Sequence, residues 1–144
     1  MPILLAVFHY LAILGLFACL FAELILLNLE SSPTTLRALG RVDIGYGSLS
    51  GVVILSGLLR VFLGETPATA WLANPAFWTK MGLFLAIGLI SVIPTLRFLG
   101  WRKAAKASGQ LPDIVARKPI RNLVVLQIVL FAGLPLFAVL MAPA

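Results

Sequence analysis

The sequence is poor in the side chains from which soluble enzymes most often build their sites. Its 144 residues include one cysteine, one histidine and five acidic residues. A zinc site needs three or four side-chain ligands, so the residues of this chain are too few to supply one. The sequence also contains no glycine-rich phosphate loop, nucleophile elbow or HExxH motif. These absences set aside the nucleotide-binding, hydrolase and metalloprotease classes that such motifs mark.

Charge is also scarce, and this scarcity indicates a membrane environment. Charged residues make up 11% of the chain and hydrophobic residues 61%, whereas about a quarter of a soluble domain is charged. The net charge is +6, and its basic residues are grouped between apolar runs with no DNA- or RNA-binding motif beside them. We therefore expect an integral membrane protein in contact with lipids, with no nucleic-acid partner.

Four apolar segments are long enough to cross a bilayer, which requires about 20 residues of helix. The first, Ile3–Leu29, ends where polar residues and Pro33 stop the apolar run. Because the connections are short, consecutive helices should be antiparallel neighbours. The sequence thus predicts an all-α fold, a four-helix integral membrane bundle in a single transmembrane domain, residues 1–144. Its expected helices are residues 3–29, 44–63, 76–99 and 123–141.

The basic residues between these segments predict the orientation of the chain. Arginine and lysine are concentrated in the first and third connections, whereas the second, residues 64–74, has neither and carries the acidic Glu65. Basic connections stay on the cytoplasmic side of a membrane. We therefore expect an N-out, C-out, multi-pass protein in the inner membrane of a bacterium.

Three basic side chains in different segments are expected at one depth. His9, Arg60 and Lys80 each lie in the outer third of their segment. Charges within a membrane are costly and often mark functional sites. One interpretation has Arg60 and Lys80 reaching the headgroups and His9 as an interfacial or hydrogen-bonded core residue. The other makes the three a cationic pocket for haem b or another anionic substrate.

In the haem interpretation, His9 is the axial ligand of the iron, and Arg60 and Lys80 pair with the propionates. One histidine excludes a bis-histidine haem within one chain, which favours a site with an open coordination position. One face of the third segment is expected to form a pocket wall. Its residues are Lys80, Phe84, Ile87, Ser91 and Thr95.

The other polar residues of the segments have simpler expected roles. Asp43 precedes the second segment, where it is expected to cap the helix, and Gln127 is expected to hydrogen-bond between helices. Glu23 lies toward the predicted cytoplasmic side. We expect it to form a structural ion pair, with a proton or ion path as the alternative. The candidate partners are Arg41, Arg97 and Arg121.

The chain resembles a group of small four-helix bacterial membrane proteins. The resemblance rests on the early His9, the short second segment and the run Phe77–Lys80 (FWTK) that opens the third. This group includes the haem-dependent protoporphyrinogen oxidases and, more distantly, the copper-resistance D-type membrane domains. Over nearly its full length the chain is more similar to an uncharacterised family of predicted bacterial membrane proteins. That resemblance implies no activity.

In the oxidases an early histidine binds haem and a lysine in the third helix is required. The resemblance therefore implies that His9 is the haem ligand and that Lys80 is this lysine. The chain departs from the oxidases in lacking an aromatic-plus-arginine pattern in the second half of the first segment. It also lacks a histidine later in the third. We infer that Arg60 replaces the missing cation.

Three functions from different classes fit these observations. The first is a b-type haem-binding redox protein, an oxidase of a porphyrin- or quinone-like hydrophobic substrate. The second is a non-catalytic accessory or assembly subunit, and the third is a small transporter in which Glu23 would be the central residue. Small residues along the second segment, including Gly47, Gly51 and Gly57, favour close helix contacts. They predict a homo-oligomer or a larger membrane complex.

Overall fold

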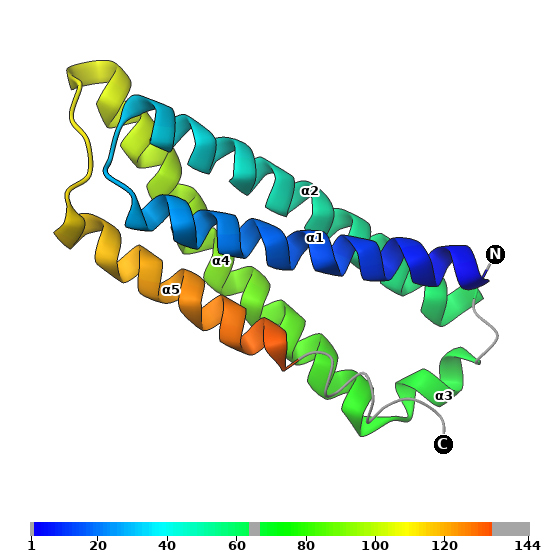
Figure 1. Ribbon diagram of the computed structural model, residues 1–144. Coiled ribbons are helices and arrows are strands. Elements are labelled where there is room, and N and C mark those ends of the chain that lie inside the picture. The colour runs from blue at the N-terminus through cyan, green and yellow to red at the C-terminus, as the bar shows by residue number, and fades with distance from the viewer. Residues whose placement is uncertain (1, 64–66, 134–144) are drawn as a thin grey trace.

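The computed structural model describes residues 2–63 and 67–133, and every secondary-structure element in them is a helix (Figure 1). This confirms the all-α prediction. The helices are α1 (Pro2–Asn28), α2 (Pro33–Leu63), α3 (Ala68–Leu72), α4 (Pro75–Ser108) and α5 (Ile114–Ala132).

Three of the described helices are long and apolar enough to cross a membrane: α1, α2 and α4. The fourth predicted segment, 123–141, runs past residue 133 and so lies partly outside the described residues. The structure therefore confirms membrane-capable helices. The count of four spans and the N-out, C-out orientation stay predictions.

The four longer helices lie side by side, and α1 packs along most of the length of α2 (Figure 1). Helix α5 packs against both α1 and α4, while α4 also contacts α2. Their shared core is built from fully buried side chains: Leu16, Leu20, Leu39, Ile87 and Val124. Many large apolar side chains on the outer faces are exposed. Lipid tails are as apolar as leucine, so these faces can meet a bilayer without penalty.

Helix α2 begins well before the predicted start at residue 44. The Ser32 hydroxyl accepts a hydrogen bond of 3.0 Å from the Thr35 amide, and Pro33 occupies the first helical position, where a missing N–H is harmless. The helix then continues through the polar residues that follow. Asp43 consequently lies inside α2, and the prediction that it caps this helix is wrong.

The later helices also differ from the expected ends. Helix α4 continues past residue 99 to Ser108, with Pro94 inside it. Helix α5 starts at Ile114 rather than residue 123, because the Asp113 carboxylate caps it by accepting from the Ala116 amide at 2.8 Å. The short α3 was expected to be part of a loop.

Contacts from the α4–α5 connection and from the start of α5 hold the end of α1. The Arg117 guanidinium donates to the carbonyls of Leu27, at 3.0 Å, and Leu29. The Ser31 hydroxyl donates to the Pro112 carbonyl at 2.6 Å. The last carbonyls of a helix have no partner within the helix. Arg117 supplies one, and so fastens α1 to the start of α5.

Candidate functional site

The structure brings the three predicted basic residues together. His9 lies in the first third of α1, Arg60 in the last turn of α2 and Lys80 near the start of α4. The charges of Lys80 and Arg60 both act on the His9 imidazole, and that of Arg60 acts on Lys80. These three residues are the basic cluster. Among the described residues no carboxyl group forms an ion pair with it, and Glu65 is not one of the described residues.

The His9 imidazole is held between α1 and α2. Its side chain is 4% exposed, and its Nδ1 lies 2.9 Å from the Ser56 hydroxyl oxygen. That hydroxyl donates its single proton to carbonyls of its own helix, those of Val52 at 2.7 Å and Val53 at 3.3 Å. The Ser56 oxygen can therefore accept the Nδ1–H of His9, which leaves the Nε2 lone pair for another partner.

Gly57 makes room for this imidazole. A Cβ placed on Gly57 would lie 3.2 Å from His9 Cε1, closer than a comfortable carbon contact. The absence of a side chain at Gly57 and the hydrogen bond to Ser56 together set the position of the ring. Arg60, one turn further along α2, stacks its guanidinium carbon 5.2 Å from the ring centroid of Tyr10. This cation–π contact holds the guanidinium beside the first helix.

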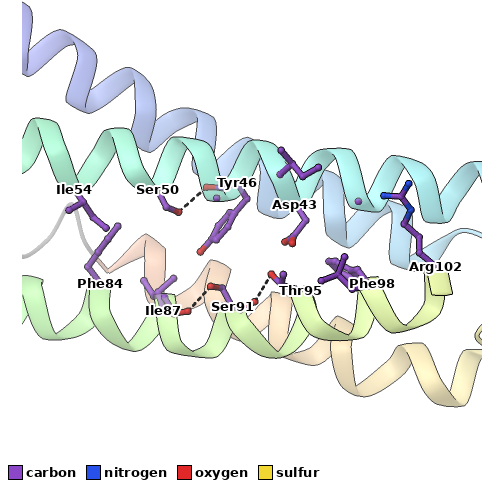
Figure 2. A pocket seen from close by; sticks show the side chains of 15 residues that line it. Asp43, Tyr46, Ser50, Ile54, Phe84, Ile87, Ser91, Thr95, Phe98 and Arg102 are labelled. Atoms are coloured by element: carbon purple, nitrogen blue, oxygen red, sulfur yellow. Dashed lines mark hydrogen bonds between the residues drawn. The ribbon is translucent and has the colours of Figure 1, made fainter. Parts of the chain in front are cut away.

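A second region with polar side chains lies between α2 and α4, where a cavity of about 480 Å³ opens (Figure 2). Phe84, Ile87, Ser91 and Thr95 of the predicted pocket wall line this cavity, but His9, Arg60 and Lys80 do not. The pocket predicted around those three basic residues therefore stays a prediction. Helix α2 contributes most of the other lining residues. Those that bring polar side chains are Asp43, Tyr46 and Ser50, with Arg102 from α4.

Beside this cavity, Glu23 is buried without a cationic partner. Its side chain is 2% exposed, and its Oε1 has no hydrogen-bond partner. The Asp43 carboxyl group interacts with it from α2. The expected ion pair with an arginine is wrong: Arg41 and Arg97 are exposed, and Arg121 donates to Asn28 at 3.3 Å.

Gln127 connects helices, as the sequence predicts. It is 0% exposed, and its Oε1 accepts a hydrogen bond of 3.3 Å from the Tyr46 hydroxyl, which joins α5 to α2. Its Nε2 has no partner. Sequence reasoning missed Tyr46 and also Ser56, the partner of His9. Ser56 precedes Arg60 by four residues, so helical spacing places both on one face of α2, which is the signal that would have found it.

Comparison with known proteins identifies a family. A family model described as predicted membrane protein (DUF2214) matches residues 1–143. The searches of curated proteins and of solved structures gave none. The family match confirms the resemblance to uncharacterised membrane proteins. The similarity to protoporphyrinogen oxidases and copper-resistance D-type domains stays a prediction.

Proposed function

The chain belongs to the DUF2214 family of predicted membrane proteins, and we propose that this membrane protein binds haem b through His9. We place it in the inner membrane of a bacterium. The observation that carries the proposal is the hydrogen bond between His9 Nδ1 and Ser56. It supports a haem ligand because it orients the imidazole and leaves Nε2 for iron.

The His9 environment fits the chemistry of an iron ligand. Histidines that bind metals almost always donate their other ring N–H to a fixed acceptor, which sets the tautomer and the direction of the ring. Ser56 is such an acceptor, because its own proton is directed to the Val52 carbonyl. Gly57 removes the side chain that would otherwise displace the ring.

The surrounding charges fit the acidic edge of haem. Arg60 and Lys80 add two positive charges beside His9, and no described carboxylate forms an ion pair with either. Two propionates would balance them through charge-assisted hydrogen bonds. Bound haem would supply redox chemistry at its iron, and the chain has no second histidine to act as another ligand. A hydrophobic porphyrin- or quinone-like molecule would suit a site in membrane-spanning helices.

The test is the absorption spectrum of protein purified from haem-replete cells, recorded oxidised and after reduction with dithionite. We expect a Soret band in the wild type, with α and β bands that sharpen on reduction. Replacing His9 by glycine should abolish these bands, and added imidazole should restore them by filling the space left by the side chain. A colourless wild-type protein would refute the proposal.

Ser56→Ala separates the role of the hydrogen bond from that of the ligand. This variant keeps His9 but removes the acceptor of its Nδ1–H. Loss of such a partner typically weakens metal binding by about 10- to 100-fold, so haem titration should show weaker binding with the same spectrum. Ser48→Ala is the matched control, because the Ser48 hydroxyl donates only to the Ile44 carbonyl of its own helix. Equal haem affinity in both variants would show that Ser56 does not contribute to haem binding.

A further inference from the structure

Polar side chains from all four longer helices meet beside the cavity. Glu23 of α1 faces Asp43 of α2. One turn along α2, the Tyr46 hydroxyl donates to Gln127 of α5 and interacts with Ser91 of α4. These five residues are the acid–amide cluster. Its Glu23 and Gln127 side chains are each at least nine-tenths buried and each keeps one atom without a hydrogen bond.

Two carboxyl groups in this setting cannot both remain ionised at low cost. Removing a carboxylate from water carries a large free-energy penalty, and a second negative charge nearby adds to it. Glu23 has no ion pair to offset that penalty, and α5 offers only the neutral Gln127. The described residues contain no group of three or more histidine, cysteine or acidic side chains that would hold a metal ion. A proton is therefore the simplest neutralising partner.

The cavity gives this proton a route to water. Asp43 lines the cavity, whereas Glu23 lies beyond it. Figure 2 shows Asp43 and Tyr46 of α2 opposite Ser91 and Thr95 of α4. Most of the lining is apolar, but Asp43, Tyr46, Ser91 and Thr95 give waters polar partners in a cavity large enough to hold several of them. The other titratable or charged groups near the acidic pair are Cys19 of α1, Tyr46 of α2 and Arg102 of α4.

We propose that Glu23 holds a proton, shares it with Asp43 and exchanges it with water in the cavity between α2 and α4. During release, the carboxylic O–H bond breaks and the proton passes to a cavity water, while the electron pair stays on the carboxylate. Uptake reverses this step. The acid–amide cluster is separate from the basic cluster at His9, so the proposal does not depend on haem. A carboxyl of this kind is what the transporter hypothesis requires.

Infrared spectroscopy of the protein in liposomes tests the protonated carboxyl group. At neutral pH we expect the carbonyl band of a carboxylic acid in haem-free wild type, and a shift of this band in deuterated water. The band should be lost in Glu23→Gln and retained in Glu30→Gln, because Glu30 is exposed. Absence of the band from the wild type, or its persistence in Glu23→Gln, would overturn the proposal.

Sodium tests the competing occupant without any substitution. Replacing choline chloride by sodium chloride at equal ionic strength should leave the wild-type band unchanged. A band that disappears as sodium is added would overturn the proton site in favour of a monovalent cation. This measurement uses only the wild type, so it decides the point even if Glu23→Gln fails to fold.

A pair of glycine variants on α4 tests the route. Gly88 lines the cavity, and a Cβ added at Gly88 or at Gly82 would have no other atom within 4 Å. Gly88→Leu should fill the cavity and slow the hydrogen–deuterium shift of the carboxyl band. Gly82→Leu should leave the rate unchanged, because Gly82 does not line the cavity. Equal rates in the two variants would overturn exchange through this cavity.

Discussion

Gly57 allows α2 to pass close to His9, and replacing it should reveal how tightly the ring is held. A Cβ at this position would lie 3.2 Å from His9 Cε1, and the Ser56 hydrogen bond prevents the imidazole from moving away freely. Gly51 lies on the same helix, and a Cβ there would have no other atom within 4 Å. The pair therefore compares the same substitution with and without a close neighbour.

The two substitutions should change the free energy of unfolding by different amounts. Alanine is favoured over glycine inside a helix by about 1 kcal/mol, so Gly51→Ala should raise the free energy of unfolding by up to that amount. At Gly57 the same gain is opposed by overpacking, which costs about 1–3 kcal/mol. Gly57→Ala should therefore lie about 1–3 kcal/mol below Gly51→Ala, since only the overpacking differs between them.

Reversible unfolding in mixed detergent micelles, followed by circular dichroism at increasing dodecyl sulfate, measures both variants. A double-mutant cycle with Ser56→Ala adds a second test. Without its hydrogen bond the His9 ring can shift, so the penalty of Gly57→Ala should decrease in that background. Equal stabilisation by Gly51→Ala and Gly57→Ala would refute a close, fixed contact between Gly57 and His9.

Two further predictions concern the end of α1 and the orientation of the chain. Arg117→Gln should lower the free energy of unfolding by about 1.5–3 kcal/mol, because a charged hydrogen-bond donor is lost. The exposed control Lys118→Gln should change this free energy little. Thermal unfolding in detergent measures both variants, and equal stability of the two would contradict the role given to Arg117. In a Cys19→Ser background, Thr69→Cys should react with a membrane-impermeant maleimide in intact cells, and Ser108→Cys should react only after permeabilisation. The reverse pattern would show that the predicted N-out orientation is wrong.

Hydropathy predicted the first helix well because its apolar run and its helix coincide: Ile3–Leu29 was expected and Pro2–Asn28 is found. In α2 the two differ. The residues that open it are polar, so hydropathy indicated a later start, whereas the Ser32 cap sets the actual one. An apolar run indicates which residues can lie in lipid, whereas a capping residue indicates where helical hydrogen bonding begins.

The same distinction explains what was found and missed at the two polar clusters. Depth along each segment was enough to bring His9, Arg60 and Lys80 to one end, because depth follows from residue counts. The partner of His9 depends on how α1 and α2 are rotated about their axes, which residue counts do not give. Asp43 was missed as the neighbour of Glu23 because it was placed outside the helix that in fact carries it.

Arg117 also bears on the order in which the protein is assembled during synthesis. It satisfies the Leu27 carbonyl across a sequence separation of 90 residues. When α1 leaves the ribosome, this partner has not yet been made, and it emerges only after α2 and α4. Until then the last carbonyls of α1 must hydrogen-bond to water, so the α1–α2 hairpin enters the membrane before these carbonyls have a partner in the protein. The hydrogen bond from Arg117 to Leu27 can form only after α2, α4 and the start of α5 have been synthesised.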